Sequence, residues 1–392
     1  MTPQSKNRME LGEQNRRLVL AEILYHRLIA RAQIAANVQL TAASVSRITK
    51  DLIAIGLVEE GEPFVENNRA GRKFVGLRIK PDSCFVTAIS INAFRQDIVV
   101  ADLANNVIAS KKLTFDRLSN AEQVLDRCAQ SLNKLVTKVG IDRSRLVGCG
   151  IAITGSTDPD QLVLRTAPAL NWGPTQVADI VRKHIDCPIY LDNIANAKNI
   201  TAHCFGPTGQ INNVLLFNVS LAIGCSLMIN GHIYRGADFQ GGIIESMMIP
   251  DFKLGKLVPI DQIAGGHSVL NPNSNDPQGK QLDQVISAAA RGDKMAQSAL
   301  ESAGSALAIA VHNTHSLLHP QAVIVSGPLL ESDYYQRSFT QSLKSLMGEA
   351  AVDAHILISP MSSLQAAQSL VIYQSIMQTD FTQLAAFQSL AS

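Results

Sequence analysis

The sequence has no run of 18 or more apolar residues, so it indicates no transmembrane helix. Residues 1–14 are polar and lack the apolar segment of a secretory signal, which argues against export. The six cysteines lie far apart and no two form a Cys-x-x-Cys pair, so neither a zinc ribbon nor a disulfide framework is indicated. We therefore expect a cytoplasmic protein with reduced thiols and no membrane association.

The 392 residues suit two or three domains, and a hydrophobic content of 46% is enough for large cores. The charge is unevenly spread. Residues 1–80 carry 13 Lys and Arg against 8 Asp and Glu, a net charge of +5, whereas the remainder carries 21 against 25, or −4. A basic N-terminal module on a mildly acidic body is typical of a unit that binds phosphate groups.

The N-terminal pattern predicts three helices followed by a β-wing. Residues 15–26 and 30–37 read as the first two helices. Thr41 can cap a third helix over residues 42–54, in which apolar side chains recur every three or four positions, and Gly56 can end it. Residues 57–79 then read as strand, polar loop and strand.

A unit of this kind presents its third helix to the major groove of DNA. On the outward face of the third helix, Arg47 and Lys50 could contact base edges or phosphates. The hydroxyl groups near the start of this helix could bind phosphates. The basic tip of the wing suits the minor groove or the backbone. The residues that we expect at DNA are Thr41, Ala43, Ser44, Ser46, Arg47, Lys50, Arg69, Arg72 and Lys73. The alternative is a small helical domain with an ordinary charged face.

The rest of the chain repeats one order of elements, β-β-β-α-β-α. The first copy begins with strands at 85–91, 97–103 and 107–115 and includes helices at 121–139 and 175–184; the second copy begins at residue 214. Two such lobes with a cleft between them describe the actin-like ATPase architecture. We therefore predict domains 1–80 and 81–392, with the cleft near residues 190–195.

Three stretches carry a family resemblance at the N-terminus. They are residues 15–20 (Asn-Arg-Arg-Leu-Val-Leu), 30–35 (Ala-Arg-Ala-Gln-Ile-Ala) and 40–58, which runs from Leu-Thr-Ala-Ala-Ser-Val to Ile-Gly-Leu-Val. Together with Gly71-Arg72 in the wing they resemble the N-terminal domain of ROK-family repressors (repressor, open reading frame, kinase). Weaker likeness continues at residues 150–155, 229–237 and 323–328. The resemblance implies a mixed α/β protein: a winged helix-turn-helix plus a two-lobed, actin-like (ribonuclease H-like) body.

The kinase chemistry of the family does not match this sequence. Where ATP-binding members have Asp-x-Gly-Gly-Thr, residues 90–94 read Ser-Ile-Asn-Ala-Phe; where they have Gly-Thr-Gly-Ile-Gly, residues 220–224 read Ser-Leu-Ala-Ile-Gly. The family's base is the Asp of Glu-Asn-Asp-Ala-Asn, and Ile194 stands in its place. We therefore expect no kinase activity and no cofactor.

The family's sugar contacts are also eroded. Ala169-Leu170 stands where the family has Asn-Leu. Residues 242–246 read Gly-Ile-Ile-Glu-Ser where the family has Gly-Glu-Ile-Gly-His, so Glu245 lies one register away. No cysteine follows Cys225, so the family's Cys/His zinc site cannot form. Asn193 and Trp172 stay as candidate ligand contacts, although burial of Trp172 against the lobe is an equal reading.

Two further groups have plain structural readings. His312, His315 and His319 share one face of a predicted helix, where a metal site is the alternative to an ordinary polar face. The carboxylates of Asp158, Asp160 and Asp192 suit turns and caps.

The sequence thus predicts a DNA-binding transcriptional regulator, a repressor of carbohydrate-related genes. We expect a homodimer or tetramer on a double-stranded operator, because one module of this size gives limited affinity. The body would support oligomerisation and bind a sugar or sugar-derivative effector. The alternatives are a regulator controlled by a partner protein without a small ligand, and a residual sugar kinase.

Overall fold

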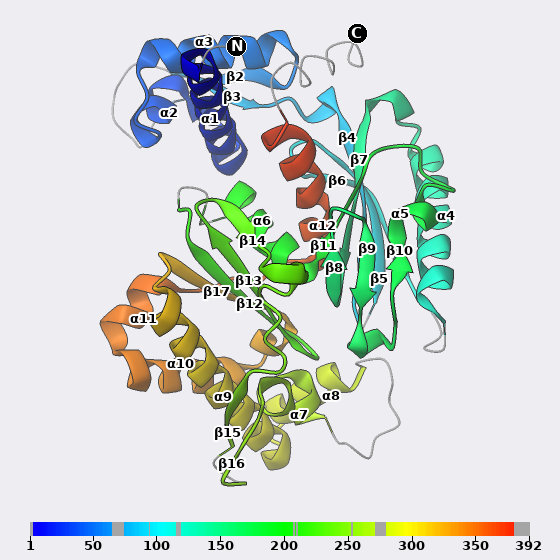
Figure 1. Ribbon diagram of the computed structural model, residues 1–392, viewed down its shortest axis with the longest axis vertical. Helices are drawn as coiled ribbons and strands as arrows, with labels where there is room; N and C mark the ends of the chain where they lie inside the picture. The colour runs from blue at the N-terminus through cyan, green and yellow to red at the C-terminus, as the bar shows by residue number, and fades with distance from the viewer. Residues whose placement is uncertain are drawn as a thin grey trace.

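The N-terminal unit is built from three helices and a small antiparallel sheet (Figure 1). In this computed structural model, residues 3–64, 74–93, 95–114, 119–206, 208, 211–251, 254–270 and 280–379 are described. The elements of the unit are α1 (Pro3–His26), β1 (Ile29–Ala30), α2 (Arg31–Asn37), α3 (Ala42–Ala54), β2 (Val58–Phe64) and β3 (Phe74–Ile79), with strand order β1-β3-β2.

Local sequence explains most of this unit. The apolar residues of α3 at spacings of three and four, among them Val45, Ile48 and Leu52, are buried. Gly56 follows with a φ of 71°, the left-handed conformation that favours glycine after a helix. The first helix, however, begins at Pro3 rather than at residue 15. Residues 4–14 are mostly good helix formers without an apolar stripe, so periodicity alone could not reveal this extension.

The first lobe is a five-stranded sheet in the order β11-β7-β4-β5-β6. Its strands are β4 (Phe85–Ile91), β5 (Gln96–Asp102), β6 (Val107–Leu113), β7 (Leu146–Ile153) and β11 (Ile189–Asn193). Alternate side chains face opposite layers, since Ile98 and Val100 pack with α4 (Ala121–Val139) and α5 (Val177–Val181), whereas Val99 and Ala101 pack with α12 (Ser363–Ile372).

A small sheet lies beside the first lobe: β8 (Ser156–Asp158), β9 (Val163–Thr166) and β10 (Thr175–Gln176). The predicted helix over residues 175–184 is therefore wrong at its start. Thr175 and Gln176 pair with Leu164 and Val163 as a strand, and α5 begins only at Val177. Hydrogen bonds from β9, which is not adjacent in the sequence, determine the extended conformation of residues 175–176.

The second lobe repeats the first, with strand order β14-β13-β12-β17-β18. Its strands are β12 (Val214–Val219), β13 (Ile223–Ile229), β14 (His232–Tyr234), β17 (Ala322–Ser326) and β18 (Ile356–Ile358). Its helices are α7 (Gly266–Val269), α8 (Lys280–Ala290), α9 (Lys294–Leu318), α10 (Asp333–Met347) and α11 (Glu349–His355), and a hairpin is formed by β15 (Met248–Asp251) and β16 (Lys256–Pro259). Both sheets thus have the order 3-2-1-4-5 when numbered within each lobe.

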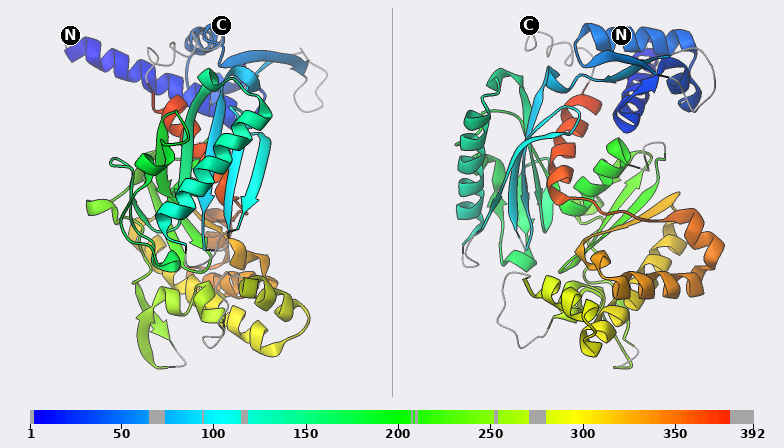
Figure 2. Two further views of the ribbon diagram at one scale, coloured as in Figure 1. Left: turned by 90° about the vertical axis from the view of Figure 1, so that its right-hand side faces the viewer. Right: turned by 180° about the vertical axis from the view of Figure 1, so that it is seen from behind.

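Two helices pack against each other between the sheets (Figures 1 and 2). Helix α6 (Ile194–Phe205) leaves the first sheet and covers the second, whereas α12 leaves the second sheet and covers the first. The N-terminal unit sits at the end of α12 and contacts α6, and its last strand, β3, leads into the first strand of the first lobe.

The cysteines and the long helices bear on redox state and membrane insertion. All six cysteines are free thiols, and five of them are buried. No helix in the described ranges is both long and apolar enough to cross a bilayer.

Candidate nucleic-acid interface and interlobe cleft

The start of α3 is fixed by Thr41. Its Oγ1 accepts a hydrogen bond from the backbone N–H of Ser44 at 3.2 Å and donates to the Ser44 hydroxyl at 3.0 Å. The N-terminus of a helix carries unpaired N–H groups and a partial positive charge, which suit an anion. Both hydroxyl groups therefore lie at the end of α3 where a phosphate would be favoured.

The outward face of α3 is open. Thr41, Ala43, Ser46, Arg47 and Lys50 are exposed and Ser44 is half-buried. The ion pairs described within residues 3–64 do not include either of the two basic side chains of this face. Among these described residues, the charges of Arg47 and Lys50 are therefore not neutralised by an acidic side chain. The predicted wing residues Arg69, Arg72 and Lys73 lie outside the described residues.

The opposite side of α3 is held in place by Arg31, a basic residue of α2. Arg31 of α2 donates to the Thr49 hydroxyl at 3.1 Å and pairs with Glu60 of β2 at 2.7 Å. Thr49 is fully buried, so this contact fixes α3 against α2 and the sheet. The exposed face is thereby presented by a rigid support.

A cleft with a cavity volume of about 690 Å³ lies between the lobes. Asn193 and Ile194, at the junction of β11 and α6, line it, and so does Trp172. The indole of Trp172 is 8% exposed and its N–H donates to the Ser119 carbonyl at 3.1 Å, so the ring forms part of the wall. The structure therefore brings the two predicted ligand contacts to one cavity.

The turn at the end of β11 is organised by Asp192. This carboxylate is 1% exposed and accepts from the Asn193 backbone N–H and the Asn196 side chain, both at 2.8 Å, and from Arg235 at 2.7 Å. Asn193 in turn caps α6 by accepting from the Asn196 backbone N–H at 2.8 Å. Asp192 thus has a positioning role at a turn, as its surroundings in the sequence indicated.

Both loops that would hold phosphates in an ATP-binding relative face the same cavity. Ala93 lines it from the first loop, and Ser220, Leu221 and Ala222 line it from the second. Close approach of a phosphate needs glycines, because side chains keep the backbone N–H groups at a distance. At the position of the base, the aliphatic side chain of Ile194 cannot accept a proton.

Several cavity residues were not predicted as ligand contacts. Asn171, Gln240, Asp261 and His267 all line the cleft, as does Glu245, for which a shifted role was left open. Burial, with a contribution from the nearby charge of Glu245, raises the pKa of Asp261 to about 6, although its carboxylate accepts from the Ile223 N–H at 2.6 Å. The only local signal was their polar character in otherwise apolar stretches.

The histidine group gains a member from a distant helix. The rings of His315 and His319 have centroids 5.3 Å apart, and His355 at the end of α11 lies 5.5 Å from His315. His319 is not in α9 but follows it with a φ of 44°. Across the described ranges, no three or more His, Cys, Asp or Glu side chains are arranged so that they could hold a metal ion.

The fold and cleft define a class: a two-lobed, actin-like body that carries a helix-turn-helix unit. The chain belongs to the ROK family, whose model matches residues 87–370.

The relatives that match over most of the chain include named regulators of transcription. The "Xylose repressor" of Caldicellulosiruptor bescii is 23% identical over 88% of this chain and 89% of its own length. The "DNA-binding transcriptional dual regulator NagC" of Escherichia coli K12 is 22% identical over 78% of each chain.

Solved structures share the fold. A ROK-family transcriptional regulator described as a homolog of the E. coli MLC protein superposes with a TM-score of 0.71, with 16% identity over 97% of this chain and 100% of that one. A ROK glucokinase from Streptomyces griseus, in complex with glucose and AMPPNP, gives a TM-score of 0.59, with 18% identity over 74% of this chain and 99% of that one. The chain therefore has the fold of both groups, and the regulator covers its N-terminal unit as well.

Proposed function

We propose that this protein is a transcriptional repressor of carbohydrate-related genes that binds a double-stranded operator through α3. The observation that carries the proposal is the exposed basic face of α3, with Arg47 and Lys50 three residues apart beside a capped helix start. Curated relatives named as xylose and N-acetylglucosamine repressors, matched over most of their length, support it. Arg69, Arg72 and Lys73 would add contacts from the wing.

The test starts with operators selected from random DNA by the full-length protein. The double variant Arg47→Ala/Lys50→Ala should lose binding in an anisotropy titration while keeping its circular dichroism spectrum. Lys134→Ala/Lys138→Ala, which removes two exposed charges from α4, is the matched control and should bind normally. Equal affinities of the two double variants would refute the assignment of α3.

We further propose that residues 1–80 act as the DNA-binding domain and 81–392 as the sensing and oligomerising body. Two modules in a homodimer or tetramer would read a two-fold-related operator. Sedimentation with and without operator should show two modules per site, and a monomer saturating the operator would contradict this.

The interlobe cleft would bind a sugar or sugar-derivative effector. The support is its size and its lining, which combines Asn171, Asn193 and Gln240 with apolar walls. Calorimetry with D-xylose, N-acetylglucosamine and the phosphate esters of these sugars should give a micromolar binder within this panel, and binding should weaken in Asn193→Ala. A protein that binds none and still responds to a partner protein would favour the partner-controlled alternative.

We also propose that the body has no sugar kinase activity. Ile194 at the base position and side chains in both phosphate loops support this. A coupled assay with ATP, Mg²⁺ and common hexoses should show no turnover above buffer, whereas turnover that is lost on mutation of the cleft would revive the kinase reading.

A further inference from the structure

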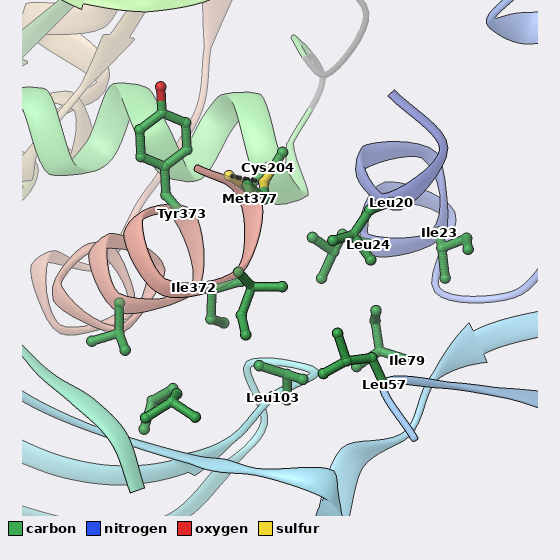
Figure 3. Packing of buried hydrophobic residues seen from close by; sticks show 14 of the residues in the cluster. Leu20, Ile23, Leu24, Leu57, Ile79, Leu103, Cys204, Ile372, Tyr373 and Met377 are labelled. Atoms are coloured by element: carbon green, nitrogen blue, oxygen red, sulfur yellow. Dashed lines mark hydrogen bonds between the residues drawn. The ribbon is translucent and has the colours of Figure 1, made fainter. Parts of the chain in front are cut away.

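The N-terminal unit shares one apolar core with the body. The cluster contains Leu20, Ile23 and Leu24 of α1 together with Ile372 of α12, and Tyr373 and Met377 beyond it. Figure 3 shows Leu20 and Leu24 on the side of α1 that faces the end of α12. Cys204 at the end of α6 contacts Met377, with sulfur atoms 3.3 Å apart. The position of α1 is therefore set by the ends of α6 and α12.

The chain beyond α12 continues as a π-helical turn, Tyr373–Met377. The backbone N–H of Gln378 donates to the Tyr373 carbonyl, five residues back, at 2.9 Å. A π-turn holds one residue more than the α-helix around it. Its conversion to α-helix would turn the following residues by about 100° and move them by about 1.5 Å. The structure shows the π-helical arrangement, and the α-helical register is the alternative that the same residues could take.

The carbonyls just after the π-turn hold α1. Arg16, which is 5% exposed, donates to the Thr379 carbonyl at 2.8 Å, and Arg17 donates to the Gln378 carbonyl at 3.2 Å. These carbonyls would leave the two guanidinium groups if the helical register changed. The residues just after the π-turn therefore supply two hydrogen bonds to the docking of α1.

The same turn is tied to the cleft through the β13–β14 hairpin. The Tyr373 hydroxyl donates to the carbonyl of Gly231, at the tip of the hairpin, at 3.3 Å. Beyond β14, Arg235 donates to Asp192, whose other oxygen accepts from the N–H of the cavity residue Asn193. A contiguous set of contacts thus joins the cavity to α1.

We propose that the π-turn at residues 373–377 is the switch through which the cleft controls the DNA-binding unit. This inference rests on the proposed function, since it describes how that function is regulated. A ligand that contacts Asn193 would alter the Asp192–Arg235 pair, move the hairpin tip and, through Tyr373, change the register of the turn. The ligand must bind one register more tightly than the other for this to occur.

Hydrogen exchange of the full-length protein, read by mass spectrometry over α1, tests the coupling without DNA or ligand. Arg235→Gln breaks the link at the cleft and Tyr373→Phe breaks it at the turn. Each should speed exchange in α1 by about three- to tenfold, the effect of one lost hydrogen bond. The double variant should exchange no faster than Tyr373→Phe alone, because both changes act on one path.

Tyr234→Phe is the matched control, since it changes a half-exposed tyrosine on the same hairpin and should leave α1 unchanged. Arg235→Lys keeps the charge and serves if the Gln variant misfolds; it should have a smaller effect of the same sign. The proposal fails if Arg235→Gln alters only the hairpin, or if its effect on α1 persists in full beside Tyr373→Phe. If the expected exchange in α1 is observed but the wild-type protein binds no operator, the proposed function is contradicted and the coupling is not.

Discussion

Replacing Lys198 with Met should change how the stability of the protein depends on pH. Lys198 is 2% exposed, and its ammonium donates to Asn218 Oδ1 at 2.7 Å and lies 3.4 Å from Ser326 Oγ. Within the described residues, both of these partners are uncharged and no ion pair involves Lys198. Burial therefore lowers its pKa to about 8.

The sign follows from the two protonation equilibria. An unfolded chain holds the lysine proton up to a pH of about 10.4. Between about pH 8 and pH 10.4 the unfolded state binds more protons than the folded state, so folding stability rises with pH. From pH 7.5 to 9.5 the contribution of this single group amounts to about 2 kcal/mol, and it approaches about 3 kcal/mol over the full interval.

Urea unfolding of the wild type and of Lys198→Met at pH 7.5 and 9.5 measures the effect. The stability of the wild type relative to the variant should rise by about 2 kcal/mol between these values. Titration of the buried cysteines acts equally on both proteins and cancels in the comparison. Lys138→Met, at an exposed site on α4, should show no such change. A difference that is constant or falls with pH would show that Lys198 is not held in a desolvated site.

Three further predictions concern the N-terminal unit. Thr41→Ala should lower the free energy of unfolding by about 1 kcal/mol through loss of the α3 cap, whereas Thr41→Ser should not; thermal unfolding distinguishes them, and equal losses would contradict the capping role. Leu20→Ala, in the core shared with the body, should cost about 2–5 kcal/mol, against little for the half-exposed Leu18→Ala on the same helix, and comparable losses in the two variants would argue against that core. Arg47→Ala alone should weaken operator binding by about 1–3 kcal/mol if it reads a base, whereas Lys50→Ala should lower the slope of log affinity against log salt by about one. Titrations at several salt concentrations separate the two roles, and an unchanged slope would remove Lys50 from the phosphate contacts.

Residue pattern alone was enough for features that depend on neighbours in the chain. The two faces of α3, the Thr41 cap and the left-handed Gly56 each follow from interactions within four residues, and the structure shows all three. The repeated order of strands and helices was also readable, because each buried element carries its own apolar period. The residues on which the expectation of no kinase activity depends, at 90–94, 220–224 and Ile194, were visible one by one in the sequence.

Tertiary structure decided what depends on distant segments. Residues 175–176 became a strand because β9 offered hydrogen-bond partners, and the cavity gathers Asn171, Glu245 and Asp261 from separate loops. The contacts from Asp192 through Arg235 to the π-turn cross more than a hundred residues of sequence, and no local period encodes them. The sequence therefore determined the local structure of the N-terminal unit, whereas tertiary packing determined how that unit is joined to the lobes and the cleft, because the contacts of α6 and α12 come from residues far apart in the chain.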